Sequence, residues 1–106
     1  MLQEVPFMDE ASIQAEALDK MSLNYFEGFA SPQPYMCYIT ADKVYFVPEI
    51  KITGKPIMAI DLADIEGYKK GFALRFHILL KDGTKVLLSL WKKSKLIEMI
   101  DKHRFA

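Results

Sequence analysis

The chain has few of the residues that support disulfides, metal sites and membrane spans. Its 106 residues include one cysteine and two histidines. A single cysteine excludes an internal disulfide bond and a metal site made of thiolates alone. No apolar run approaches the roughly 20 residues that cross a bilayer as a helix, and residues 1–10 lack the basic start and apolar core of a secretion signal. These absences favour a cytoplasmic protein. The length favours a single domain over residues 1–106, because two cores within this length would each be marginal.

Basic side chains are almost missing from the first part of the chain. Residues 1–42 hold one basic side chain, Lys20, against seven acidic ones. Residues 43–106 hold thirteen basic against seven acidic ones, so the net charge of zero divides into −6 and +6. Such asymmetry is typical of a basic half that binds an anionic partner. Alternatively, the two halves attract each other within the fold or across a dimer.

Hydrophobic sequence is abundant, at 51% of the chain, and its clearest pattern is a long hairpin over residues 72–91. Residues 81–84 predict the turn, with Gly83 in the left-handed backbone conformation. A three-residue loop with a glycine bulge pairs Phe76 with Leu88 and makes one face of the hairpin apolar throughout. The sequence therefore predicts the bulged register, with that face buried.

Two helices are predicted on either side of a region of β structure. The first is a short amphipathic helix over residues 10–21 with Asp9 as its N-cap, and the second covers residues 94–104 with Ser94 as its N-cap. Seven short strands are predicted within residues 23–91. They comprise strands at residues 23–30, 57–60 and 63–70 and hairpins at 35–49 and 72–91, with loops at 31–34 and 50–56. Because a long antiparallel meander cannot bury both faces alone, it must close into a barrel or two packed sheets.

Three segments, in this order, resemble the GRAM and bacterial pleckstrin-homology-like (PH-like) domains. Residues 38–46 (YITADKVYF) match the first hairpin of those domains, residues 60–65 (IDLADI) match a following strand, and residues 81–83 (KDG) match a later hairpin. The resemblance covers residues 23–104. It implies a partly open, seven-stranded antiparallel barrel capped by the C-terminal helix, which binds lipids, peptides or proteins; the N-terminal helix is an addition. The basic loop of the lipid-binding members corresponds to residues 30–34, which contain no Lys or Arg.

No arrangement of residues in the sequence is typical of an enzyme, cofactor or metal site. His77 and His103 have no second histidine, cysteine or carboxylate at ligand spacing. Cys37 falls at an inward strand position, which is typical of a small buried hydrophobic residue. The acidic residues within 61–66 lie at a bend between strands, where turn and cap residues are common. We therefore expect no catalytic activity, cofactor, metal ion or nucleic-acid partner.

The first functional hypothesis is a non-enzymatic PH/GRAM-like interaction module that mediates protein–protein contact or self-association as a homodimer. The outer face of the long hairpin is too apolar for ordinary solvent-exposed surface. Either the N-terminal helix or a second copy of the chain would cover this face. The candidate interface residues are Leu79, Leu87, Trp91 and His77.

The alternative hypothesis is a peripheral membrane protein that binds anionic lipid through lysine-rich loops. Lysines at the start of a helix oppose the helix dipole, so the lysine run that leads into the last helix favours a binding role. Trp91 beside it would anchor the protein at the membrane interface. Charge that keeps the surface soluble would explain the same lysines. The candidate lipid-binding residues are Lys51, Lys55, Lys69, Lys70, Lys92, Lys93 and Lys95.

Overall fold

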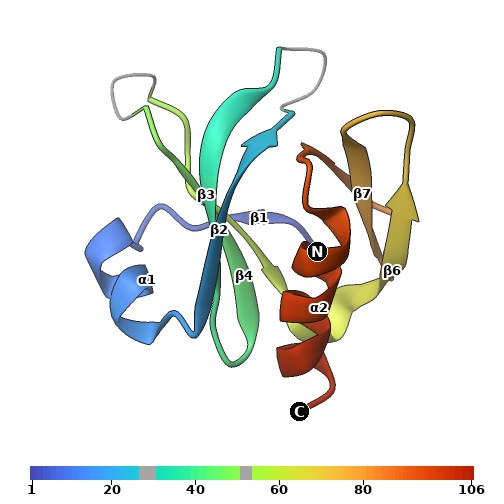
Figure 1. Cartoon of the computed structure of the whole chain (residues 1–106). Helices are drawn as coiled ribbons and strands as arrows, with labels where there is room; N and C mark the ends of the chain where they lie inside the picture. The colour runs from blue at the N-terminus through green and yellow to red at the C-terminus, as the bar shows by residue number, and fades with distance from the viewer. Residues whose placement is uncertain (27–30, 51–53) are drawn as a thin grey trace.

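An antiparallel sheet of eight strands forms the body of the molecule (Figure 1). The computed structural model describes residues 1–26, 31–50 and 54–106. The strands are β1 (Gln3–Glu4), β2 (Asp19–Tyr25), β3 (Gln33–Ile39), β4 (Lys43–Pro48), β5 (Met58–Asp61), β6 (Ile65–Lys70), β7 (Arg75–Leu80) and β8 (Lys85–Ser89). The other elements are helix α1 (Glu10–Glu16), a 3-10 turn η2 (Leu62–Asp64) and helix α2 (Lys93–Arg104). Across the sheet the order is β1-β5-β4-β3-β2-β8-β7-β6, and the sheet does not close within the described residues.

Both predicted hairpins are present, and the β7–β8 hairpin has the predicted bulged register. In the β7–β8 hairpin, Phe76 lies opposite Leu88, and Gly83 in the turn has φ 89°. In the β3–β4 hairpin, Cys37 lies opposite Phe46. The inward side chains of both hairpins are buried. A shift of one residue would turn every one of them towards solvent, so their burial fixes the register.

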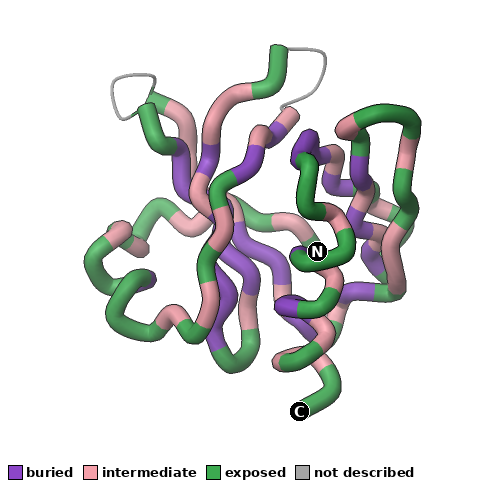
Figure 2. The backbone as a smooth tube through the Cα atoms, in the orientation of Figure 1, coloured by how far each residue is buried: buried purple, intermediate pink, exposed green. Residues whose placement is uncertain are grey.

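The main hydrophobic core lies between the curved sheet and α2. Its strand residues are drawn as buried segments along the inner strands (Figure 2). Helix α2 contributes Leu96, Met99 and Ile100 to this core, while Lys95, Glu98 and Lys102 are exposed. The C-terminal helix therefore covers the open side of the sheet, as the sequence predicts.

Helix α1 covers the opposite face of β3, β4 and β5, where a second hydrophobic cluster lies. Ile13 is 0% exposed and packs in this cluster with Tyr38, Tyr45, Val47 and Ala59. The Tyr38 hydroxyl donates to Glu10 Oε2 at 3.0 Å and accepts from Gln14 Nε2 at 2.9 Å. One buried isoleucine and two polar contacts thus attach the helix to β3.

Helix α1 is shorter than predicted. It begins as expected, since the Asp9 side chain accepts a hydrogen bond from the Ser12 N–H at 2.7 Å. It ends at Glu16 rather than at residue 21, and β2 begins at Asp19 rather than at residue 23. The apolar residue Met21, which fits a helical stripe after Ile13, also fits the two-residue period of β2 and lies opposite Cys37. Pairing with β3 therefore outweighs helix propensity in this segment.

Three smaller predictions also differ from the structure. The loop predicted over residues 31–34 is partly strand, because β3 begins at Gln33. Helix α2 begins at Lys93 and lacks a side-chain cap, so Ser94 is not its N-cap. The sheet has eight strands rather than seven because the two-residue β1 pairs with β5. Residues 27–30 of the predicted first strand and residues 51–53 of the predicted loop lie outside the described residues.

The last residue of α2 contacts the backbone at the start of β6. Arg104 Nη2 donates to the carbonyl oxygen of Ile65 at 2.7 Å and to that of Glu66 at 3.2 Å. The Tyr68 hydroxyl of the same strand donates to Asp101 at 2.8 Å. This end of the sheet is therefore attached to the C-terminal end of α2.

Candidate functional site

The lysines predicted to bind lipid do not form one patch. Lys51 lies outside the described residues. Lys55 lines a hollow of about 270 Å³ beside β4 and the start of α1. The other five, at the end of β6 and the start of α2, are Lys69, Lys70, Lys92, Lys93 and Lys95.

Hydrogen bonds join the turn between β6 and β7 to the start of α2. Lys93 Nζ donates to the carbonyl oxygens of Gly71 at 3.0 Å and Ala73 at 2.6 Å, and Lys70 Nζ donates to Ser94 Oγ at 3.0 Å. Ala73 has φ 57°, a left-handed conformation that costs a non-glycine residue roughly 1–2 kcal/mol. Lys93 therefore holds the turn in shape, and its ammonium group is already occupied by protein oxygens.

Two aromatic side chains lie exposed beside this junction. Phe72 in the turn is 91% exposed, and Trp91 just before α2 is 85% exposed. Their segments run side by side, since the Leu90 N–H donates to the Leu74 carbonyl at 2.9 Å. Both segments lie at the same end of the molecule (Figure 1). We call this surface the aromatic end; its residues are Phe72, Trp91, Lys69, Lys70 and Lys92.

Sequence reasoning identified Trp91 and the lysines of the aromatic end but missed Phe72. The sequence feature that could have indicated an exposed Phe72 is its position directly after Gly71, at a turn where no core position was predicted. Phe72 was instead counted as the first residue of a strand, whereas β7 begins at Arg75.

A hollow opens where β2 separates from β8. β2 pairs with β3 along its whole length but with β8 only at Asn24 and Tyr25. β8 ends at Ser89, and the chain then turns into α2 instead of continuing along β2. A hollow of about 610 Å³ lies at this divergence, lined by residues 21–24 and 89–92.

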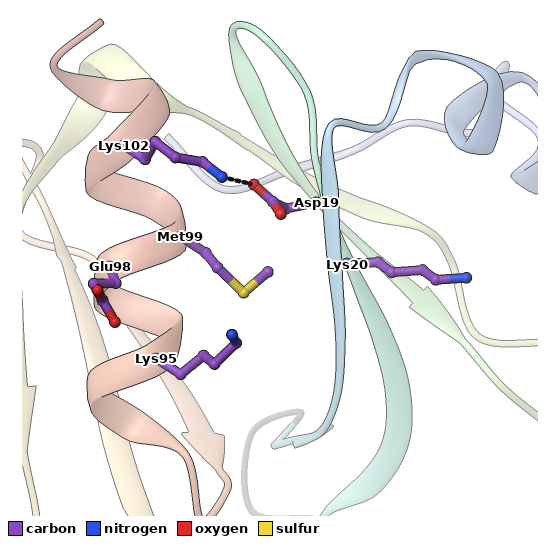
Figure 3. Close-up of a pocket in the computed structure, with 6 residues that line it drawn as sticks. All are labelled: Asp19, Lys20, Lys95, Glu98, Met99 and Lys102. Atoms are coloured by element: carbon purple, nitrogen blue, oxygen red, sulfur yellow. Dashed lines mark ion pairs between the residues drawn. The ribbon is translucent and has the colours of Figure 1, made fainter.

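The hollow continues between β2 and α2 as a second space of about 590 Å³ (Figure 3). Lys95 and Met99 point from α2 towards β2, whereas Lys20 and Glu98 point away from the gap. We call the two spaces together the β2–α2 groove. Lys95 therefore belongs to this groove rather than to the aromatic end.

An ion pair closes the groove at the far end of β2. Asp19 Oδ2 lies 3.0 Å from Lys102 Nζ (Figure 3). The same oxygen lies 2.7 Å from His103 Nε2. The hydrogen bond with His103, and then that with Lys102, lowers the pKa of the Asp19 carboxyl. This contact joins the acidic first part of the chain to its basic second part, as one of the two explanations of the charge division predicts.

The residues predicted to form a protein interface are separated by the structure. His77, Leu79 and Leu87 lie on the outer face of the β7–β8 hairpin and are half-buried, whereas Trp91 is exposed beyond the end of β8. Burial, followed by the charges of Lys69 and Lys85, lowers the pKa of His77. Their role as an interface stays a prediction.

The cysteine and the acidic residues that were considered as possible reactive groups have structural roles in the fold. Cys37 is fully buried, and burial raises the pKa of its thiol to about 12. Asp61 pairs with Lys43, and Asp64 pairs with the N-terminal amine. Within residues 1–26, 31–50 and 54–106, no group of three or more His, Cys, Asp or Glu side chains is arranged to hold a metal ion. No helix in the same residues has the length and apolar character needed to cross a membrane.

Comparison with known proteins relates the chain to others by structure alone. No family model matches the sequence, and no match was found among curated proteins. The C-terminal domain of an unknown protein from Leishmania infantum is similar, with a TM-score of 0.72, 13% identity and 91% of each chain covered. The N-terminal PH domain of human ARAP2 has a TM-score of 0.58 and 14% identity over 80% of this chain and 74% of its own. The DH/PH domain of human ARHGEF11, solved with RhoA, has a TM-score of 0.63 and 11% identity, over 84% of this chain and 29% of the other.

These similarities agree with the arrangement of the sheet and α2. The chain has a PH-like fold, as the sequence resemblance implies, with α1 as an addition on the outer face of the sheet.

Proposed function

We propose that residues 1–106 form one non-enzymatic interaction module that attaches to an anionic membrane surface through the aromatic end. The observation that supports this function is the pair of aromatic side chains, Phe72 and Trp91, exposed next to lysines. Large aromatic groups are costly to leave in water unless a partner covers them. Tryptophan favours the interface between lipid headgroups and acyl chains.

The charges of the aromatic end suit an anionic surface. A lysine near an anionic leaflet contributes about 1 kcal/mol to binding, and the effect weakens with salt. Lys92 and Lys69 are exposed and make no ion pair within the described residues. Lys93 and Lys70 instead hold the turn that carries Phe72. The aromatic end thus combines two apolar side chains, lysines without an ion pair within the described residues, and a turn held by hydrogen bonds.

Fluorescence of the single tryptophan provides a direct test. Trp91 is the only tryptophan of the chain and is exposed to water. We expect its emission to shift to shorter wavelength on mixing with vesicles of 70% phosphatidylcholine and 30% phosphatidylserine. Pure phosphatidylcholine should give no shift, and raised salt should weaken binding in flotation. Vesicles that leave the emission unchanged and float without protein would contradict the proposal.

Matched variants localise the binding surface. Phe72→Ser and Lys92→Gln should each weaken flotation several-fold, because one removes an anchor and the other a charge. Phe105→Ser and Lys81→Gln are the controls, since they make the same changes at the far ends of α2 and β7. Phe105 is itself 71% exposed, so equal losses in Phe105→Ser and Phe72→Ser would place binding elsewhere.

Self-association is the second candidate function, and the exposure of Trp91 favours it as well. A second copy of the chain would cover Trp91 and the half-buried Leu87 around a two-fold axis. A cytoplasmic location, peripheral at the membrane in the first case, remains a prediction in both.

A further inference from the structure

One edge of β2 faces the β2–α2 groove instead of a neighbouring strand. Phe26 donates its backbone N–H to the Leu87 carbonyl at 3.1 Å, on the β8 side. Because backbone groups alternate along an antiparallel strand, those of Ser22 and Lys20 point to the same side. Among the described residues, no strand lies beside them there, since the β2–β8 pairing covers only Asn24 and Tyr25.

From this edge and the side chains around it, we propose that the β2–α2 groove binds an acidic, extended segment of a partner protein, which adds to β2 as a short strand. Strand addition to an open edge obtains affinity from main-chain hydrogen bonds and specificity from alternate side chains. The open part of β2, residues 20–23, is about 13 Å long at roughly 3.3 Å per residue. A segment of about four residues would therefore fill it.

The charges that line the groove favour carboxylates in the bound segment. Lys95 points into the gap, Lys92 lines the part where β2 and β8 diverge, and neither makes an ion pair within the described residues. The acidic group inside the groove, Asp19, is neutralised by Lys102 and His103. Two further acids, Glu98 and Glu49, also line the groove; Glu98 points away from the gap.

Apolar side chains complete the groove. Met99 points from α2 towards β2, and Met21 and Leu90 line the wall where β2 and β8 diverge. In a strand, alternate side chains point to opposite faces, so one set would lie on this apolar floor and the other would reach the lysines. The groove thus suits a segment in which apolar and acidic residues alternate.

At the C-terminal end of α2, a side chain of the helix is bonded to the backbone of a strand. Arg104 occupies the carbonyl oxygens of Ile65 and Glu66 on β6. No comparable side chain of α2 is bonded to the β2 backbone among the described hydrogen bonds; the helix reaches β2 through the Asp19 side chain. We infer that β2, and not β6, is the edge at which a partner strand adds.

Binding of synthetic peptides to the full chain tests the proposal without any membrane. The probe is a fluorescein-labelled octapeptide of alternating valine and glutamate, followed by anisotropy. We expect it to bind, and we expect a valine–lysine octapeptide not to bind. A valine–glutamate peptide methylated on alternate backbone nitrogens should bind at least about tenfold more weakly, because it lacks the N–H groups of the added strand.

Two charge-reversed variants decide where the peptide binds. Lys95→Glu should weaken binding about tenfold or more, whereas Lys81→Glu, which makes the same change at the β7–β8 turn, should leave it unchanged. Amide signals of Ser22 and Lys20 should shift in nuclear magnetic resonance spectra on titration. The proposal is overturned if the acidic peptide does not bind, or if it binds Lys95→Glu as tightly as the unmodified chain. It is also overturned if the methylated peptide binds as tightly as the unmethylated one. If the unmodified chain binds the acidic peptide but not the anionic vesicles, the membrane function is rejected and the peptide-binding proposal stands.

Discussion

At the scale of single residues, Asp19 has the most consequential contact because it joins β2 to α2. Its carboxylate lies within hydrogen-bond distance of both Lys102 and His103, and its side chain is about one quarter exposed. The pKa of Asp19 is lowered from its ordinary value of 3.8, because the charged form is the one that the two partners stabilise. The contact therefore stabilises the folded state only while Asp19 is ionised.

The lowered pKa of Asp19 predicts a pH-dependent contribution to stability. A carboxyl whose pKa falls on folding stabilises the protein above its unfolded value, and this contribution is lost as pH falls through the folded value. We expect Asp19→Asn to reduce the free energy of unfolding by about 1 kcal/mol at pH 6 and to have little effect well below pH 3. Urea unfolding of both proteins at the two pH values measures this. Asp42→Asn, an exposed change in the β3–β4 turn, is the control, and a pH-independent difference would contradict the prediction.

Residue roles at the aromatic end show what sequence patterns leave out. Trp91 and Lys92 were predicted as surface groups from their neighbours in the sequence. Lys93 was grouped with them, although its side chain turns back to carbonyls twenty residues earlier in the chain. The direction of a long side chain depends on such distant contacts, and no local pattern records them.

At the scale of elements, α1 is a helix that depends on the sheet beneath it. It has seven residues, fewer than an isolated helix needs to be stable in water. Its buried contact is Ile13, which packs against Tyr38 and Val47 on the outer face of the sheet. Packing, rather than helix propensity, therefore holds α1 in place.

Removing the Ile13 side chain should destabilise the protein. We expect Ile13→Ala to lower the free energy of unfolding by about 2–5 kcal/mol, the usual cost of such a change at a fully buried site. Ala15→Ser on the exposed side of α1 should change it by less than about 0.5 kcal/mol. Chemical unfolding measures both. Equal stability of Ile13→Ala and the unmodified chain would show that α1 is not packed as described.

The hairpins could be predicted from sequence and the boundary between α1 and β2 could not. In the β7–β8 hairpin, Gly83 and an alternating apolar face agree on one register. In the segment after Glu16, Met21 suits both a helical and a strand period, and only its position opposite Cys37 decides between them. β1 has two residues, too few to show any period.

At the scale of the whole molecule, the resemblance of three sequence segments to PH-like domains implied the fold, and the order of the hairpins and the final helix agreed with it, whereas neither indicated the groove. The groove exists because β8 leaves β2 at Ser89, and a sequence does not show where two strands part. Lys95 and Trp91 were named as candidates, but the groove that both of them line depends on that separation. Asp19 was not singled out, since its partners lie more than eighty residues away.

The self-association hypothesis also belongs to the whole molecule. It predicts that the 12.2 kDa chain sediments as a dimer, and that Leu87→Glu with Trp91→Glu yields a monomer because two charges would be buried at the interface. Leu18→Glu is the control, as Leu18 is 57% exposed beside α1. Analytical ultracentrifugation over a range of concentrations measures the mass. An unchanged mass in the double variant would contradict the prediction.

The Arg104 contact with β6 has a consequence for behaviour in concentrated solution. An outermost strand with free carbonyl oxygens is a template on which identical chains polymerise. Arg104 occupies two such oxygens on β6, and the strand at the opposite border, β1, is only two residues long. The short β1 and the start of β6 are therefore poorly suited to propagate fibrils, and the protection of β6 is lost when the C-terminal end of α2 frays.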